Sequence, residues 1–345
     1  MPVDWSGRVG QAVRVRVPAT SANLGPGFDA LGLALALHDV VEARICPSGL
    51  SIEVSGEGAS AAGAGEDHLV ARAMRAAFGR IGGQPPGIAL RCVNTIPHGR
   101  GLGSSAAAIV SGILAARALA AGGEDALPDD AVLALAAGLE GHPDNVAACL
   151  AGGLTVAWTS DGRVRSVRLS PLPGVLPVAC ISPSPLATEA ARKVLPASVP
   201  HADAAANAGR SALLIAALTS DPGALLDATQ DFLHQPYRAA VLPGTAELVS
   251  RLREAGIPAV VSGAGPSVLA LLVSDPAAQV SDPAAQAGEP AGSPVTRCHP
   301  GLYMIDSIAR ETGIPWHVSP LGIDRHGASI VPVAPGTPAA GSTPE

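Results

Sequence analysis

Residues 97–106 read PHGRGLGSSA and carry the strongest signal in the chain. In full they are Pro97, His98, Gly99, Arg100, Gly101, Leu102, Gly103, Ser104, Ser105 and Ala106. The alternate glycines leave no Cβ in the way, so backbone N–H groups can turn toward a ligand. A predicted helix starts at Ser104 and points its positive end at the same place, which favours binding of a polyphosphate. The spacing fits neither a Walker A loop nor the Rossmann glycine pattern, and taken alone the segment could also be an ordinary turn.

Regular elements are predicted on both sides of this loop. The segment 88–93 reads as a strand that enters it, and the helix after it runs to about residue 120. Alternating Val and Arg over 12–18 predicts a half-buried strand, and helical spacing predicts a helix over 68–81 that ends at a glycine pair. Further strands are expected at 40–45, 50–54, 153–158, 164–169, 175–181, 257–261, 268–273 and 315–319, and further helices at 128–140 and 301–312. The strand at 315–319 is expected to finish the fold.

Composition excludes several classes of protein. Apolar residues make up 48% of the 345 residues, and the formal net charge is −7 without any run of Lys or Arg. Nucleic-acid and anionic-membrane surfaces need clustered positive charge, so neither partner is expected. The apolar stretch 106–123 is bounded by glycines and carries Ser111 and Arg117, and it is read as a buried helix.

The cysteines point to a reducing compartment. They lie at positions 46, 92, 149, 180 and 298, an odd number without a CxxC pair, which predicts neither a disulfide framework nor a zinc site. The first ten residues have no basic region followed by an apolar core, so no signal peptide is expected. We therefore expect a cytoplasmic location.

Three more segments concentrate polar groups. PATSANLGPGFD at 18–29 follows the first strand, EGHPDN at 140–145 lies between two apolar helical runs, and SGAGPS at 262–267 is a second glycine turn. Taken together and in this order, the four segments resemble the motifs of the GHMP kinase superfamily, and their wording is similar to that of its homoserine kinase family. The resemblance runs from about residue 13 to residue 318.

The resemblance implies a two-domain α+β fold. The N-terminal domain, residues 1–170, would be ribosomal-protein-S5-like with a left-handed βαβ crossover, an exception to the usual rule. The C-terminal domain, residues 171–333, would be ferredoxin-like, followed by a flexible tail at 334–345. The Pro-rich PLPGVLP near residue 170 is a plausible boundary. A tandem repeat, VSDPAAQ-VSDPAAQ at 273–286, is expected in a disordered surface loop.

The resemblance also implies an activity, namely ATP-dependent phosphorylation of the side-chain hydroxyl of L-homoserine, a step of threonine biosynthesis. ATP would lie over residues 97–106, with Gly263 and Gly265 in the second glycine turn, and Ser105 and Glu140 would hold Mg²⁺. The residues implied around the amino acid are Asn23, Asp29, His142, Asn145, Thr188, Arg192 and Arg238. Among them Asp29 suits an ammonium group, and Arg192 and Arg238 suit a carboxylate.

The catalytic set implied is Glu140, Asp144 and Asn145. Positioning and charge stabilisation do most of the work in such a transfer, and whether a base is used stays open. Asp144 is the candidate base, with a helix-capping role as its alternative. Two other functions also stay open: a GHMP kinase acting on mevalonate or a sugar, and an inactive homologue that only binds a ligand. A homodimer is expected, although no residue pattern specifies the oligomeric state.

Overall fold

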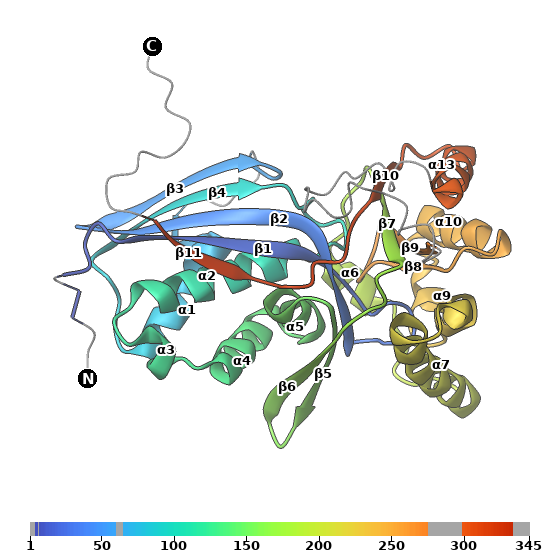
Figure 1. The fold of residues 1–345 in the computed structure, drawn as a ribbon, viewed down its shortest axis with the longest axis horizontal. Helices are drawn as coiled ribbons and strands as arrows, with labels where there is room; N and C mark the ends of the chain where they lie inside the picture. The colour runs from blue at the N-terminus through green and yellow to red at the C-terminus, as the bar shows by residue number, and fades with distance from the viewer. Residues whose placement is uncertain (1–3, 6, 60–64, 275–298, 334–345) are drawn as a thin grey trace, which may run out of the picture.

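The structure is a computed structural model that describes residues 4–5, 7–59, 65–274 and 299–333. These residues form two β-sheets, one of seven strands and one of four. Figure 1 shows the larger sheet with its helices gathered on one face, beside the smaller sheet and the helices of the second half. The expected α+β class with two domains is confirmed.

The larger sheet has the order β11-β1-β2-β4-β3, and β5 pairs with both β2 and β6. Its strands are β1 (Ala12–Ala22), β2 (Leu31–Cys46), β3 (Gly49–Gly56), β4 (Gly87–Asn94), β5 (Leu154–Ser160), β6 (Arg163–Leu169) and β11 (Ser329–Val333). Its pairs are antiparallel except β3 with β4, which are parallel and joined through helix α1. The parallel pair with its helix is a βαβ unit, as the resemblance implied, and the left hand of its crossover stays a prediction.

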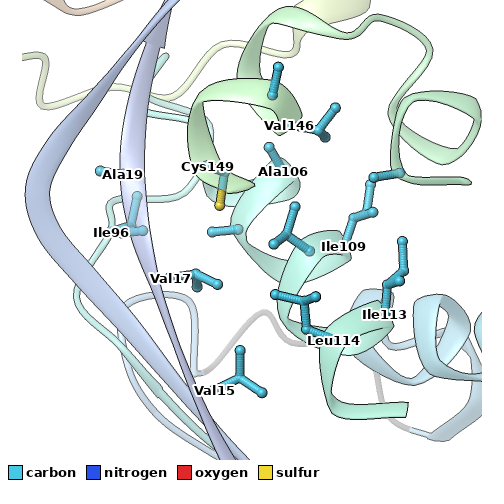
Figure 2. Close-up of a cluster of buried hydrophobic side chains, with 14 of the residues drawn as sticks. Val15, Val17, Ala19, Ile96, Ala106, Ile109, Ile113, Leu114, Val146 and Cys149 are labelled. Atoms are coloured by element: carbon cyan, nitrogen blue, oxygen red, sulfur yellow. The ribbon is translucent and has the colours of Figure 1, made fainter. Parts of the chain in front are cut away.

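The alternation of Val and Arg in β1 determines which face of the strand packs against the core. Val13, Val15 and Val17 are buried, while Arg14 and Arg16 between them are exposed, because successive side chains of a strand point to opposite faces. Figure 2 shows the buried side of this strand facing the helix that follows the predicted phosphate loop, residues 97–106. The labelled residues include Val15, Val17, Ile109, Ile113 and Leu114.

Helices α1 (Leu69–Ile81), α2 (Ser104–Leu119), α3 (Gly123–Ala126), α4 (Asp129–Glu140) and α5 (Asp144–Ala151) cover this face (Figure 1). The helical spacing of α1 predicts that Leu69, Met74, Ala77 and Phe78 point inward; the last three are buried and Leu69 is half-buried. Helix α2 lies so close to α1 that a Cβ at Gly112 would come within 2.5 Å of the Val70 carbonyl oxygen. Small residues therefore let these helices pack closely in a chain with few aromatic side chains.

The smaller sheet has the order β10-β7-β9-β8, antiparallel throughout, which is the strand order of a ferredoxin-like domain. Its strands are β7 (Val175–Ile181), β8 (Ala259–Val261), β9 (Val268–Val273) and β10 (His317–Pro320). The accompanying helices are α6 (Thr188–Lys193), α7 (His201–Thr219), α8 (Leu225–Ala228), α9 (Gln235–Arg238), α10 (Pro243–Glu254) and α13 (Pro300–Glu311), with a 3₁₀ turn at Pro222–Ala224; the other 3₁₀ turn, Gly65–Asp67, precedes α1 at the larger sheet. Leu248 and Leu252 of α10 and Ile305 of α13 pack into its separate core.

The end of the fold differs from the expectation. The chain does not finish at the strand near residue 319, because β11 returns to the larger sheet and pairs with β1. The division near residue 170 stays a proposal, and it coincides with the passage from β6 to β7. The limit at 333 also stays a proposal, although residues 329–333 pair in the sheet of the N-terminal half.

Some expectations fall outside the described residues. The VSDPAAQ repeat beyond Ser274, Cys298 and the tail 334–345 are among them. The other cysteines, at 46, 92, 149 and 180, are free thiols. No helix among the described residues is long and apolar enough to cross a bilayer.

Candidate active site

The loop between β4 and α2 depends on its glycines. Gly99, Gly101 and Gly103 have φ values of 65°, 73° and 73°, in the region that favours glycine. A Cβ on Gly101 would collide with the Ser262 carbonyl oxygen, and one on Gly103 with the Thr20 side chain. Because α2 begins at Ser104, its unpaired N–H groups open onto this loop. The loop and helix end together suit a polyphosphate.

A cleft of about 200 Å³ opens at this loop. The four polar segments of the sequence meet there, together with the turn before α6 and the end of α9. The residues that line it are Ala22, Asn23, Asp29, Gly99, Gly101, Gly103, Ser104, Ser105, Glu140, His142, Asp144, Asn145, Leu186, Ala187, Arg192, Arg238, Gly263 and Ala264. Segments more than 200 positions apart in the sequence therefore build one site.

Buried hydrogen bonds join these segments. The Thr20 hydroxyl donates to Asn145 Oδ1 at 2.7 Å, and the Thr20 backbone N–H donates to the Leu102 carbonyl oxygen at 3.0 Å. Ser262 Oγ lies 2.7 Å from the Gly101 carbonyl oxygen. The phosphate loop is thus bound on one side to β1 and on the other to the second glycine turn.

Asn23 holds the turn that follows β1. Its Nδ2 donates to the Gly263 carbonyl oxygen at 2.8 Å, and its Oδ1 accepts the Asp29 backbone N–H at 2.9 Å. Asn23 and Asp29 both have positive φ, which costs free energy for a non-glycine residue and needs such support. The side chain of Asn23 therefore shapes the cleft wall in addition to lining it.

Ser105 and Glu140 meet across the cleft. Ser105 Oγ donates to Glu140 Oε1 at 2.6 Å. Burial raises the pKa of Glu140 above its usual value, although the hydrogen bond from Ser105 acts against this. No Lys or Arg among the described residues forms a salt bridge with Glu140, and the positive charge that acts on this half-buried carboxylate is that of His142. Two hard oxygen donors in this setting fit Mg²⁺.

His142 and Asp144 form a second polar pair, with His142 Nδ1 2.6 Å from Asp144 Oδ1. Burial alone would lower the pKa of His142, but the hydrogen bond to Asp144 and the charges of Asp144 and Glu140 outweigh it and raise that pKa. Asp144 is the first residue of α5, and its Oδ1 also accepts the backbone N–H of Asn145. Asn145 lies in the first turn of α5, so this hydrogen bond satisfies one of the N–H groups that a helix start leaves unpaired, and capping stays the alternative role for Asp144.

Asp29 and Arg192 bind each other. Arg192 Nη1 and Nη2 donate to the two carboxylate oxygens of Asp29 at 3.0 and 2.6 Å, a bidentate pair that is about one third exposed. The hydrogen bond to Asp29 raises the pKa of Arg192, against the effect of burial. The two opposite charges that were predicted to bind a zwitterionic amino acid are therefore paired with each other.

Arg238 is 1% exposed and lines the same cleft. Its guanidinium group donates to neutral acceptors: the Ala191 and Gly263 carbonyl oxygens and His234 Nδ1. Burial lowers its pKa, and the nearby positive charge of Arg192 acts in the same direction. No salt bridge of Arg238 to a carboxylate occurs in the described part of the chain.

Sequence comparisons agree with this geometry. The family described as "GHMP kinases N terminal domain" matches residues 68–153, and "GHMP kinases C terminal" matches residues 213–289. The homoserine kinase of Streptomyces coelicolor is 51% identical over 94% of this chain and 96% of its own length. That of Streptomyces avermitilis is 52% identical, over 94% of this chain and 97% of its own. The chain belongs to the GHMP kinase family.

A solved structure gives the same result. The homoserine kinase from Cytophaga hutchinsonii superposes with a TM-score of 0.76 at 26% identity, covering 93% of this chain and 97% of that one. Less similar structures, such as a mevalonate diphosphate decarboxylase from Staphylococcus aureus at 14% identity and a TM-score of 0.57, share the fold.

Not every residue predicted for ATP lines the cleft of this GHMP kinase. Leu102 and Ala106 are buried in the core, and Arg100 donates to the carbonyl oxygens of Ser182 and Pro183, tying the loop to the second half of the chain. Pro97 and Gly265 are not lining residues, and His98 lies in a neighbouring hollow.

Thr188, predicted to lie around the amino acid, begins α6 next to Ala187 in the cleft wall, but its side chain is not described. The roles predicted for these residues stay predictions.

The neighbouring hollow was not predicted from the sequence. It has a volume of about 320 Å³, shares Ser104 and Ser105 with the cleft, and continues along β4 and the start of α1. It is lined by Asp39, Val41, Asp67, His68, Leu69, Val70, Cys92, Asn94, His98, Ser104, Ser105, Ala107, Ala108 and Ser111. These residues carry no contiguous motif, so only the fold could bring them together.

Proposed function

We propose that this protein is a homoserine kinase, which transfers the γ-phosphoryl group of ATP to the side-chain hydroxyl of L-homoserine and yields O-phospho-L-homoserine. One observation carries the choice of acceptor: a carboxylate, Asp29, and two guanidinium groups, Arg192 and Arg238, line one cleft with the phosphate loop. This set suits a zwitterion, because its ammonium group can bind the aspartate and its carboxylate can bind the guanidinium groups. A sugar offers neither an ammonium nor a carboxylate group. The homoserine kinases that are 51% and 52% identical to the chain support the assignment.

The internal ion pair fits a zwitterionic ligand. The amino acid's ammonium can replace Arg192 at Asp29, and its carboxylate can replace Asp29 at Arg192, so each charged side chain exchanges one partner for another of the same sign. Such an exchange avoids leaving a desolvated charge unpaired, which is the costly outcome. Arg238 adds a guanidinium group that has no carboxylate to release.

We further propose that the ATP phosphates lie at Gly99–Ser105 and that the nucleoside extends into the neighbouring hollow. The N–H groups of the loop and of the first turn of α2 would bind phosphate oxygens. The hollow begins at Ser104 and Ser105, which also line the cleft, so one ligand can occupy both. Its wall is largely apolar, which suits a purine base.

Ser105 and Glu140 would hold Mg²⁺, since they are hard oxygen donors in contact with each other. When bound, this ion would neutralise charge on the phosphates. Asp144 has Oδ1 occupied by His142 and by the Asn145 N–H, which leaves Oδ2 to accept the hydroxyl proton if a base is used. Otherwise, transfer rests on positioning by Asn145 and the neighbouring residues.

A direct test is ATP consumption with Mg²⁺ and homoserine, mevalonate, galactose or shikimate as acceptor. Homoserine should be the best acceptor by a wide margin. Turnover of galactose or mevalonate without turnover of homoserine would contradict the proposal, and absence of turnover with all acceptors would favour an inactive ligand-binding homologue.

The setting of the reaction is also a proposal: a step of threonine biosynthesis, carried out in the cytoplasm by a homodimer. The free buried thiols Cys92, Cys149 and Cys180 are compatible with a reducing compartment. Light scattering coupled to size exclusion tests the assembly, since a dimer doubles the chain mass of 34.1 kDa.

A further inference from the structure

His234 lies directly behind Arg238. The imidazole is fully buried, with Nδ1 2.9 Å from Arg238 Nη1 and Nε2 2.9 Å from the Gly25 carbonyl oxygen. A guanidinium group can only donate, so Nδ1 accepts, and the proton must be on Nε2, from where it is donated to Gly25. The contacts thus select one neutral tautomer of His234. Burial also lowers the pKa of His234, with the positive charge of Arg238 acting in the same direction.

The orientation of His234 is held by its surroundings. Asp231 accepts the backbone N–H groups of Leu233, His234 and Gln235, which fixes the turn before α9. The ring stacks on Phe28, with centroids 5.1 Å apart. Phe28 also lies beneath both guanidinium groups, 5.7 Å from that of Arg192 and 5.6 Å from that of Arg238.

Gly25 belongs to the turn that carries Asn23 and Asp29. Asn23, Leu24, Gly25 and Asp29 have φ values of 68°, 51°, 81° and 55°, so this turn needs tertiary contacts to keep its shape. His234 connects the turn to Arg238, and Arg238 in turn reaches Gly263 and Ala191. Within the described part of the chain, the hydrogen bonds of Arg238 use Nε and Nη1 and none uses Nη2, which leaves that nitrogen for a ligand in the cleft.

We propose that His234 is a positioning residue for the phosphotransfer reaction: its neutral imidazole fixes the Arg238 guanidinium relative to Asn23 and Asp29, and so fixes the carboxylate of the acceptor. The inference rests on the proposed function. It assigns to His234 a role in acceptor binding through Arg238, without contact to the acceptor or to ATP.

Two substitutions separate the contacts of His234. His234→Gln can place an amide N–H near the Nε2 position but loses the acceptor for Arg238, whereas His234→Asn can place its oxygen near Nδ1 and loses the donor for Gly25. The Gln variant should raise the KM for homoserine by about tenfold or more, as expected for loss of a hydrogen bond to a charged group. The KM for ATP should stay within about twofold, and the Asn variant should lie closer to the parent.

The decisive readout is a double-mutant cycle with Arg238→Met. If His234 acts through Arg238, His234→Gln should add less than about twofold to the homoserine KM in that background. His317→Gln, on an exposed residue of β10, is the matched control and should leave all constants unchanged. Thermal unfolding of each variant measures folding separately. If the Gln variant does not fold, His234→Phe in the two backgrounds gives the same test, since phenylalanine keeps the ring that stacks on Phe28 but lacks the acceptor for Arg238.

The outcomes distinguish this inference from the proposed function. A parent enzyme that does not phosphorylate homoserine refutes the proposed function before any variant is made. A parent that does, with variants of unchanged homoserine KM or with an equal His234 effect in both backgrounds, refutes the positioning role alone.

Discussion

Glu140 carries a charge that is poorly solvated in the free protein and that a bound cation would stabilise. Its carboxylate is held against Ser105 at the N-terminus of α2, and burial raises its pKa because the charged form is poorly solvated. A divalent cation at these oxygens would supply the missing positive charge. The same reasoning applies to Arg238, a buried guanidinium group whose hydrogen bonds go to neutral acceptors. Each residue therefore carries a charge that a ligand of opposite charge would pair with.

Glu140→Gln should lower kcat/KM with homoserine by about 10²-fold or more, since the amide keeps the shape and the hydrogen bond with Ser105 but loses the charge. Raising the Mg²⁺ concentration should not fully restore turnover. Steady-state kinetics at several Mg²⁺ concentrations check this, with thermal unfolding as the control for folding. Near-normal turnover would remove Glu140 from the proposed metal site.

Arg238→Ala should raise the homoserine KM by about 30-fold or more, because truncating one partner of a desolvated charge pair costs about 2–5 kcal/mol. Arg238→Lys keeps the charge without the planar fork and should show a smaller rise. The KM for ATP should hardly change. Arg251→Lys is the matched control, since Arg251 is exposed and pairs with Glu247. An unchanged homoserine KM in both Arg238 variants would contradict its proposed role.

At the scale of elements, the phosphate loop is shaped by what packs around it. It leaves β4 and enters α2, and its glycines approach β1 on one side and the second glycine turn on the other. Thr20 is the central contact, bonded to Leu102 of the loop and to Asn145 of α5. The loop is therefore positioned by two other elements, and its sequence alone does not set its location.

Gly103→Ala should destabilise the protein by about 1–3 kcal/mol and impair ATP use, because the added methyl group meets Thr20 at a backbone φ of 73°. Gly138→Ala in α4 is the matched control: nothing lies within 4 Å of its added Cβ, and it should be neutral or stabilising by about 0.5–1 kcal/mol. Urea unfolding and the KM for ATP measure both effects. Equal behaviour of the two variants would show that the tight turn is not required.

At the scale of the whole molecule, the last described segment closes the chain on its beginning. After β10 it runs back to the larger sheet, where Leu35 and Ile323 form a bridge and β11 pairs with β1. Asp324 anchors this path: its Oδ2 lies 2.6 Å from His38 Nε2, and its Oδ1 accepts the backbone N–H groups of His326 and Gly327. The two halves are thus joined by this return strand as well as by the site.

Asp324→Asn should lower stability most at neutral pH. Burial alone would raise the pKa of Asp324, but the hydrogen bonds from His38, Gly327 and His326 outweigh it and lower that pKa to about 2. A carboxyl with a depressed folded-state pKa stabilises above its usual value of 3.8, and this contribution is lost as the pH falls toward about 2. Urea midpoints of parent and variant should therefore differ above pH 4 and converge below it. A gap that is independent of pH would show that the charge does not matter.

Much could be predicted from the sequence because the signals were local. Periodicity predicted β1 and α1 closely, since alternation and helical spacing reflect burial of one face. The motif segments predicted the family, which is confirmed, and the glycine loop before α2, whose binding of phosphate stays a proposal. β11 was missed because it is short and contains Pro332, which a strand tolerates only at the edge of a sheet, where β11 lies.

What the sequence by itself determined is the set of chemical groups: a glycine loop before a helix, hydroxyl and carboxylate oxygens, two arginines and one aspartate. The tertiary structure decided which of these groups meet. Only there does Asp29 bind Arg192 and Ser105 reach Glu140, because these contacts join segments that are far apart in the sequence and are brought together by the packing of strands and helices. Local patterns encode burial and turn geometry, whereas distances across a cleft depend on the whole arrangement of strands and helices.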